Sequence, residues 1–308
     1  MTNKIVAIQG NQPSKLNPKT DTSIFLAHEI QNKNYKIFYY DPKELSVINS
    51  EVIASGFFIK FDYKDKNFFK IQKKQKLALT KCKFILIRQD PPFNLEYISA
   101  TYILDTIKDK VKILNNPTSI RNISEKLYSV RYQKFMPSTI FTQNISEIKN
   151  FFKTHKRVII KPIHSYGGND IHLLNRFNSK FINQFIKKHD HIMFQKFLPK
   201  ISKGDKRVFL INGKVCGAIS RVPKQGSFLS NMSKGAKPIS IELTKTEKKI
   251  SKLIAKDLKK ENIFFAGIDF IDQKLNGDIN VTSPTGLKTL YDLSGINLAK
   301  TFWKELKA

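Results

Sequence analysis

Cysteine is nearly absent from the sequence, and its scarcity argues against both disulfide and zinc chemistry. Cys82 and Cys216 are the two cysteines in 308 residues, and each lies in an apolar run typical of a strand. Buried reduced thiols are therefore favoured over a disulfide. No Cys-x-x-Cys pair and no cysteine–histidine cluster occurs, so a zinc site is not expected.

Long apolar runs are missing as well. No stretch of the sequence is long enough to cross a bilayer. The opening residues, MTNKIVAIQG, have the pattern of a short strand and not of a signal peptide. We therefore expect a soluble, cytoplasmic protein without a membrane partner. The apolar content of 41% is ordinary, and this length is enough for more than one subdomain.

Acidic residues are scarce, and the resulting charge is the most unusual feature of the composition. The chain has 25 Asp and Glu against 54 Lys and Arg, a formal net charge of +29. Such a balance suggests nucleic-acid binding. However, only seven of the basic residues are arginines, and the lysines are scattered among abundant Ile, Asn and Phe, as AT-biased coding produces. A nucleic-acid surface would gather arginine and aromatic residues in one patch. We therefore predict no nucleic-acid partner, although the positive field would attract anionic small substrates.

The first third of the chain alternates strand and helix patterns. The predicted strands are KIVAIQ (4–9), YKIFYY (35–40), KFILIRQD (83–90) and the start of VKILNNP, ending at Asn115 (111–115). The predicted helices are DTSIFLAHEIQNKN (21–34), capped by Asp21 or Thr22, and NLEYISATYILDTIKDK (94–110). This order predicts a doubly wound parallel sheet, in which ligands gather at the carboxyl ends of the strands. Arg88 lies at one such end.

The rest of the chain predicts two further α/β units. The middle third has a helical pattern over 118–135, followed by strands at 138–142, 157–163, 167–174 and 192–198 and helices at 145–155 and 181–189. The last third has a hairpin over 205–223 that turns at Asn212-Gly213, a long helix over 244–262, strands at 265–271 and 278–284, and a terminal helix. No internal repeat and no low-complexity linker is present.

The stretch VIIKPIHSYGGNDIH has features of a phosphate-binding loop. A strand carries Lys161, and a loop with Gly167 and Gly168 follows it. Glycines let backbone N–H groups approach phosphate oxygens, and a lysine fixed on a strand supplies a positive charge. The stretch is not a Walker A motif. A plain β-hairpin with an exposed lysine explains the same residues equally well.

Two neighbouring stretches could complete a nucleotide site. In IMFQKFLPK, an adenine could bind the exposed backbone of Gln195, Lys196, Phe197 and Leu198, although taken alone an ordinary buried strand is the better interpretation. Asp205, in KGDKRVFL, could accept a hydrogen bond from a ribose hydroxyl, but it could equally be a turn residue.

Two of the scarce acidic residues fall in GIDFIDQKLNGDINVTSP. Asp278 and Asn280 are two apart on a strand, so their side chains share a face, and Asp269 lies on a neighbouring strand within an apolar run. Carboxylates that converge in this way repel each other unless a cation lies between them. Mg²⁺ prefers such oxygen ligands, completed by water and substrate phosphates. We favour a metal site here over a solvated hairpin with capping acids.

The few arginines are further candidates for a site. Arg207 and Arg221 lie on the two strands of one predicted hairpin, and Arg88 ends a buried strand. Where lysine is the usual basic residue, an arginine suggests bidentate binding of a carboxylate or phosphate. For any one of them, a surface salt bridge stays an alternative.

Taken in order, these stretches resemble the prokaryotic glutathione synthetase family of ATP-grasp carboxylate–amine ligases. The resemblance runs from about Asn17 to Pro284, and its most specific parts are RQDPPFNLEYISATYILD, NNPTSIRNISEKLY, IIKPIHSYGGNDI, KGDKRVFLINGK and INVTSPTG. It implies an ATP-grasp fold with an N-terminal substrate domain (1–118) and an ATP-grasp region (119–308). The latter would divide into a central lid subdomain (119–198) and a C-terminal subdomain (199–308) with a mobile loop (224–237).

The resemblance also implies a role for each candidate residue. Those implied to bind ATP are Lys126, Lys161, Gly167, Gly168, Gln195, Lys196, Phe197, Leu198 and Asp205. Asp269, Asp278 and Asn280 would hold Mg²⁺, for which Mn²⁺ could substitute. Arg207, Arg221 and Asn231 would line the catalytic site. Asp21, Thr22 and Arg88 would meet the peptide. Asp278 stands where the family usually has glutamate, and one extra residue near Asn276-Gly277 would lie in the preceding turn.

The implied reaction joins γ-glutamylcysteine to glycine with ATP, through an acyl phosphate, in a homo-oligomer expected to be a tetramer. The alternatives are another ATP-grasp ligase with a different amino-acid or peptide acceptor, a nucleotide-binding regulator without activity, and a basic nucleic-acid-binding protein. No Ser-His-Asp or Cys-His set of residues is present, as expected for a reaction that uses no nucleophilic side chain.

Overall fold

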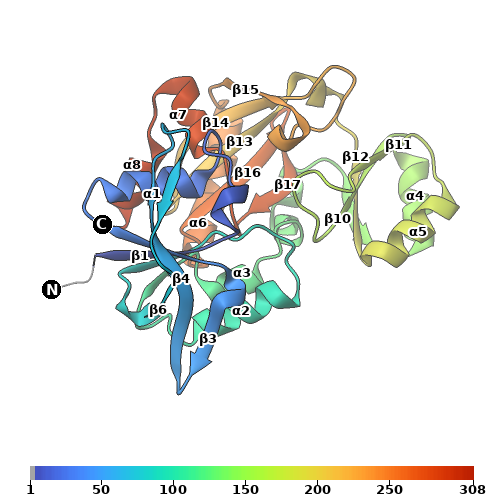
Figure 1. Ribbon diagram of the computed structural model, residues 1–308. Helices are drawn as coiled ribbons and strands as arrows, with labels where there is room; N and C mark the ends of the chain where they lie inside the picture. The colour runs from blue at the N-terminus through green and yellow to red at the C-terminus, as the bar shows by residue number, and fades with distance from the viewer. Residues whose placement is uncertain (1–3) are drawn as a thin grey trace.

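The computed structural model describes residues 4–308, which form three β-sheets with helices packed against them (Figure 1). The first sheet lies between residues 5 and 114, the second between 139 and 196, and the third between 205 and 280. The second sheet and its helices form a lobe at the right of Figure 1, apart from the other two sheets. The boundary predicted at 118 falls inside a helix and that at 198 directly follows a strand; both stay predictions.

The first sheet has a parallel centre, as the sequence predicts. Its strands are β1 (Ile5–Gln9), β2 (Lys36–Tyr40), β3 (Leu45–Ile48), β4 (Glu51–Phe61), β5 (Phe69–Ile71), β6 (Gln75–Ala78), β7 (Phe84–Ile87) and β8 (Lys112–Leu114). They run in the order β3-β4-β2-β1-β7-β8, with β2, β1, β7 and β8 parallel. The antiparallel strands β3 to β6, over residues 45–78, are an addition that the sequence analysis did not predict.

Helices cover both faces of this sheet, which makes it doubly wound. On β1, Val6 and Ile8 pack in the same core as helix α1 (Thr22–Gln31), whereas Ala7 packs with α2 (Leu95–Asp105) on the opposite face. The side chain of Asp21 accepts a hydrogen bond from the Ile24 N–H and caps α1. The cap provides an acceptor for one of the backbone N–H groups at the start of α1 that have no partner within the helix.

The second sheet is antiparallel and has its own small core. Its strands, in the order β11-β10-β12-β9, are β9 (Thr139–Thr142), β10 (Val158–Pro162), β11 (His172–Leu174) and β12 (Ile192–Lys196). Helices α4 (Ile145–Thr154) and α5 (Ser179–His189) bury Ile148, Phe152 and Ile182 against it. Before this sheet, the predicted helix over 118–135 is divided into α3 (Pro117–Asn122) and a 3₁₀ helix, η4 (Leu127–Phe135).

The third sheet, also antiparallel, runs in the order β15-β14-β13-β16-β17. Its strands are β13 (Asp205–Ile211), β14 (Lys214–Val222), β15 (Lys237–Ser240), β16 (Phe265–Ile271) and β17 (Lys274–Asn280). Helix α6 (Lys245–Lys260) packs on one face, and α7 (Leu287–Ser294) and α8 (Leu298–Glu305) pack on the other. The predicted terminal helix is therefore two helices. Trp303 of α8 donates a hydrogen bond to the Leu26 carbonyl and so joins this unit to α1.

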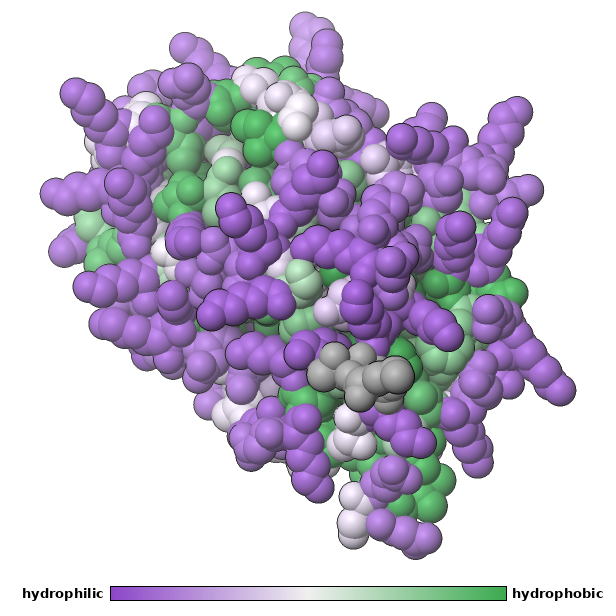
Figure 2. All heavy atoms as spheres, turned by 90° about the vertical axis from the view of Figure 1, so that its left-hand side faces the viewer, coloured by the Kyte–Doolittle hydropathy of each residue, from purple (hydrophilic) through white to green (hydrophobic). Residues whose placement is uncertain are grey.

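The surface agrees with a composition dominated by scattered lysines. Figure 2 shows hydrophilic side chains spread over the face that it presents, without one continuous stripe. Cys82 and Cys216 are both free thiols, the first buried and the second half-buried, and burial raises the pKa of Cys82 to about 12. Within residues 4–308, no helix is both long and apolar enough to span a membrane.

Candidate active site

A cavity of about 850 Å³ lies where the second and third sheets meet. Its lining includes every residue that the sequence analysis assigned to ATP, to the metal or to catalysis. The structure therefore brings together residues between 126 and 280 that lie far apart in the sequence, whereas the role predicted for each stays a prediction.

One end of the cavity is apolar and is bordered by β12. Ile159, Phe197, Leu198 and Ile271 line it. The buried Gln195 side chain donates a hydrogen bond to the Thr139 hydroxyl at 3.0 Å, which fixes the strand end. Within the described chain, the Leu198 N–H donates no hydrogen bond to another group. A flat heterocycle could therefore bind here between apolar side chains and use that free donor.

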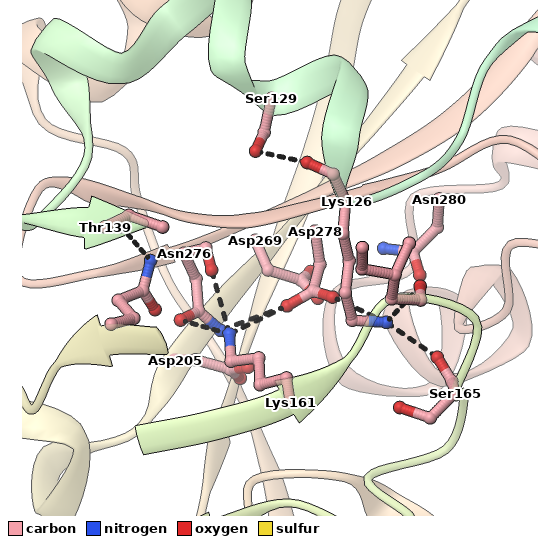
Figure 3. A network of polar contacts seen from close by, with 12 residues as sticks. Lys126, Ser129, Thr139, Lys161, Ser165, Asp205, Asp269, Asn276, Asp278 and Asn280 are labelled. Carbon is pink, nitrogen blue, oxygen red and sulfur yellow. Dashed lines mark hydrogen bonds and ion pairs between the residues drawn. The ribbon is translucent and has the colours of Figure 1, made fainter. Parts of the chain in front are cut away.

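Two buried lysines surround Asp278 (Figure 3). Lys161 Nζ lies 3.2 Å from Asp278 Oδ2 and donates to the Asn276 carbonyl at 2.9 Å. Lys126 Nζ lies 3.7 Å from Asp278 Oδ1 and donates to the Ser165 carbonyl at 2.6 Å. Burial alone would raise the pKa of Asp278, but Lys161 and Lys126 hold it below its ordinary value. The carboxylate is therefore ionised at neutral pH.

A second set of charges forms a ladder across three strands. Arg207 donates to both carboxylate oxygens of Asp269, at 2.5 and 2.8 Å. Arg221 donates to both oxygens of Asp205, at 2.8 and 2.5 Å, and also lies 3.1 Å from Asp269. The strand register explains the ladder, since Arg207 is directly opposite Asp269, and Asp205 directly opposite Arg221.

The pKa values of the two carboxylates in the ladder are shifted in opposite directions. Burial opposes ionisation of Asp269, yet the flanking Arg207 and Arg221 lower its pKa to about 2. For Asp205, burial is the larger effect and raises the pKa, although Arg221 opposes it. The ribose role predicted for Asp205 must therefore be performed by a carboxylate already bound to a guanidinium.

Strand β17, which carries Asp278, contains a β-bulge. The bulge places the Asp278 side chain toward Lys126 and Lys161. Ile268 pairs with Ile279 and Phe270 with Leu275, so residues 276–278 together face Asp269. Gly277 lies in the bulge with φ 84°, and a Cβ there would come within 2.4 Å of Met193 Cε. The extra residue was predicted in the hairpin turn. The turn is instead at 272–273, and Asn276-Gly277 lies within β17; the extra residue itself stays a prediction.

A larger adjoining cavity, of about 1570 Å³, is bordered by the loops that follow β1 and β7 of the first sheet and by loop 224–237. Asp21, Asn231, Arg207 and Arg221 line it. Thr22 and Arg88 do not line it, but Arg88 binds the lining residue Pro284, and Thr22 binds Gly286 just beyond the lining. The Thr22 hydroxyl accepts from the Gly286 N–H at 3.1 Å, and Arg88 donates to the Pro284 carbonyl at 3.1 Å. The peptide role predicted for them stays a prediction.

Two loops meet over the cavities. Lys234 of loop 224–237 donates to the Asn169 side chain at 2.8 Å. Beside this contact, Gly168 has φ 76°, and a Cβ there would lie 2.3 Å from Asn231 Oδ1. A residue other than glycine would therefore push the loops apart. The loop that carries Asn231 is in a position to cover bound substrates.

Sequence reasoning missed three groups that complete the site. Asn276 accepts hydrogen bonds from Lys161 through both its carbonyl and its side chain, the Ser165 carbonyl accepts from Lys126, and Glu125 lines both cavities. Asn276 belongs to an Asn-Gly pair that looked like a turn. Ser165 contributes only its backbone, which no sequence pattern reveals. Glu125 was visible as the neighbour of Lys126 in SEKLY.

The arrangement fits a metal that is bound together with a nucleotide. Asp269, Asp278 and Asn280 line one cavity, but residues 4–308 contain no group of three or more acidic, histidine or cysteine side chains placed to hold a metal. Two carboxylates and an amide leave about half of an octahedral shell to water and phosphates, which is usual for Mg²⁺ with nucleotides. Both carboxylates are already paired with basic side chains, so a cation must compete for them.

Solved structures identify the fold. The chain aligns with the D-cycloserine synthetase DcsG at a TM-score of 0.67 and 9% identity, covering 98% of this chain and 99% of that one. It aligns with the ATP-grasp ligase PsnB, complexed with a precursor variant, Mg and ADP, at 0.64 and 13%, covering 99% and 98%. The fold is therefore that of the ATP-grasp ligases.

Sequence comparison places the chain within that class. Residues 5–121 match the N-terminal domain of prokaryotic glutathione synthetase, and residues 125–295 match its ATP-grasp domain. The chain is 33% identical to the glutathione synthetase of Bradyrhizobium diazoefficiens over 98% of this chain and 97% of that protein. It is 35% identical to that of Prochlorococcus marinus, covering 91% of each. The chain belongs to the prokaryotic glutathione synthetase family and is an ATP-dependent ligase.

Proposed function

We propose that the protein forms glutathione from γ-glutamylcysteine and glycine, with release of ADP and phosphate, and uses Mg²⁺ with ATP. The observation that carries this proposal is the convergence of Lys126, Lys161, Asp269 and Asp278 in a cavity that opens beside a second, larger one. The first cavity suits a nucleotide and the second a peptide. Glutathione synthetases of similar sequence support the choice of substrates.

The chemical problem is that a free carboxylate is a poor electrophile. Transfer of the γ-phosphoryl group of ATP to the substrate carboxylate gives an acyl phosphate, which the glycine amine then attacks as phosphate leaves. Such a transfer depends on positioning and charge neutralisation. Lys126 and Lys161 would draw the phosphates toward Asp278. Mg²⁺, held by Asp269, Asp278 and Asn280, would neutralise further phosphate charge.

The arginine ladder would act on the substrate carboxylate. Arg207 and Arg221 line both cavities, so their guanidinium groups lie where nucleotide and peptide would meet. There they would hold the carboxylate in line and stabilise the oxyanion of the tetrahedral adduct. Loop 224–237 would exclude water, which competes with the amine for the acyl phosphate. Asn231 would enter the site with that loop.

A panel of acceptors tests the proposal. Phosphate release is measured with ATP, Mg²⁺ and either γ-glutamylcysteine or other carboxylate peptides, each with glycine or another amine. We expect turnover with γ-glutamylcysteine and glycine, and mass spectrometry should detect glutathione. Omission of each substrate in turn measures uncoupled hydrolysis. Turnover with a different pair only would show instead a related ligase with another acceptor.

We also predict that metal binding depends on nucleotide. Because Asp269 and Asp278 are paired with arginine and lysine, the protein alone offers a divalent cation little free charge. Phosphate oxygens supply the missing ligands, so affinity for Mn²⁺ should rise about tenfold or more when ATP or ADP is added. Titration followed by electron paramagnetic resonance measures free Mn²⁺ directly. Equal affinity without nucleotide would show that the side chains form a complete site by themselves.

The family resemblance supports two further proposals, a cytoplasmic location and a tetrameric homo-oligomer. We also propose that the protein has no nucleic-acid partner, because its basic residues are mostly scattered lysines and only seven are arginines.

A further inference from the structure

Glu125 makes an unusual set of contacts with the segment that follows β17. One oxygen of its carboxylate, Oε1, accepts hydrogen bonds from the Val281 N–H at 2.8 Å, the Thr282 N–H at 3.0 Å and the Thr282 hydroxyl at 2.9 Å. Its backbone carbonyl accepts from the Ile279 N–H at 2.9 Å. Glu125 therefore binds the chain on both sides of Asn280.

The side chain of Asn280 is held by a separate hydrogen bond to β16. Its side-chain Nδ2 donates to the Gly267 carbonyl on β16 at 3.1 Å, which leaves the amide oxygen as the group available to a ligand. The neighbouring Ile279 and Val281 are fully buried, whereas Asn280 lines both cavities. The direction of the amide oxygen is thus fixed by the backbone positions that Glu125 holds.

From these contacts we propose that Glu125 is a positioning residue for the metal–nucleotide site. It holds residues 279–282 so that Asn280 and the adjacent Asp278 present their oxygens together. The inference rests on the proposed function, because it concerns the metal that accompanies ATP. Groups that orient metal ligands typically change metal affinity or activity by about 10- to 100-fold when they are removed.

The three hydrogen bonds to Oε1 are those expected of a positioning residue. Three donors already share Oε1, and they include two backbone N–H groups that would otherwise be left without a partner. A glutamine keeps the length of the side chain and an acceptor oxygen but loses the charge. An aspartate keeps the charge but is one methylene shorter and cannot reach both N–H groups in the same way.

The test compares E125A, E125Q and E125D for Mn²⁺ binding in the presence of ADP, measured by electron paramagnetic resonance. We expect E125A and E125D to bind Mn²⁺ about 10- to 100-fold more weakly, and E125Q to stay within about threefold of the unmodified protein. Nucleotide binding without metal should change little. If E125A fails to fold, the pair E125Q and E125D still decides the question.

The matched control is E261A. Glu261 pairs with Arg131 at 3.0 Å and so ties η4 to the end of α6, but it lines neither cavity. Its replacement should leave Mn²⁺ binding unchanged. The proposal is overturned if E125A binds Mn²⁺ normally, or if E125Q is weaker than E125D, which would make the charge the essential property. A protein that binds no metal–nucleotide complex at all would refute the proposed function instead.

Discussion

Replacement of Asp278 with asparagine is expected to lower kcat by about 10²- to 10³-fold, the usual cost of one preorganised electrostatic group. Asparagine preserves the size of the side chain and removes the charge. Lys161 and Lys126 then lose the carboxylate between them, and the metal loses one of its two carboxylates. Phosphate release at saturating ATP, followed against metal concentration, measures the effect. The metal concentration that gives half-maximal turnover should rise, while the maximal turnover falls.

The same variant should fold. Lys161 keeps two acceptors on Asn276, and Lys126 keeps the Ser165 carbonyl, so neither buried ammonium loses all its partners. The matched control is D272N in the same hairpin, where Asp272 is exposed, pairs with Lys200 and has φ 47°. Asparagine tolerates that conformation, so activity should not change. Full activity in D278N would remove Asp278 from the metal site.

Where the residues of a turn were typical of a β-hairpin, the sequence predicted the hairpin correctly. The turn at Asn212-Gly213, with φ 48° and 77°, is the two-residue hairpin that an Asn-Gly pair favours. Other hairpins use less typical residues. Asn49-Ser50 joins β3 to β4 with φ 49° and 64°, and because this turn contains no glycine, no local pattern predicted a hairpin there. This accounts for the unpredicted antiparallel strands over 45–78.

On β17, which carries Asp278 and Asn280, an Asn-Gly pair predicted the wrong position for the turn. Asn276-Gly277 resembles a hairpin turn but lies in a bulge, whereas the turn itself is made by Asp272 and Gln273, with φ 47° and 63°. Packing decided between them, because Leu275 and Ile279 are both fully buried and must share the core face. Leu275 pairs with Phe270 and Ile279 with Ile268, so four steps along β17 oppose only two along β16, and the strand must bulge. Local propensity does not contain that information.

The sequence predicted which residues belong to the site, but not which acid pairs with which arginine. A carboxylate within an apolar run marked Asp269, and the scarcity of arginine drew attention to Arg207 and Arg221. Which acid faces which arginine depends on strand register across β13, β14 and β16. Register is fixed by long-range packing and is not visible in the spacing. The structure also explains why positions 207 and 221 carry arginine and not lysine. All the ladder residues are buried, and bidentate pairing with a carboxylate suits a guanidinium better than an ammonium.

Replacement of Asp269 with asparagine should both inactivate and destabilise the protein. Arg207 would lose its bidentate partner while it stays buried, and breaking such a pair costs about 3–5 kcal/mol. The pKa of Asp269, about 2 against an ordinary 3.8, adds a pH signature. A lowered pKa contributes stability that is present above 3.8 and is lost as pH falls toward 2. Thermal unfolding from pH 7 to 2 should therefore show a shallower acid loss in D269N.

The double variant R207M/D269L separates stability from chemistry. Removal of both charges leaves no unpaired guanidinium at this position, and Arg221 keeps Asp205 as its partner. Because apolar residues of similar size often replace a buried ion pair at little cost, the double variant should recover most of the stability that D269N loses. It should stay inactive, since it lacks both a metal ligand and a catalytic arginine. Equal stability of D269N and the unmodified protein would mean that the pair contributes nothing to folding, and recovered activity in the double variant would remove both residues from the mechanism.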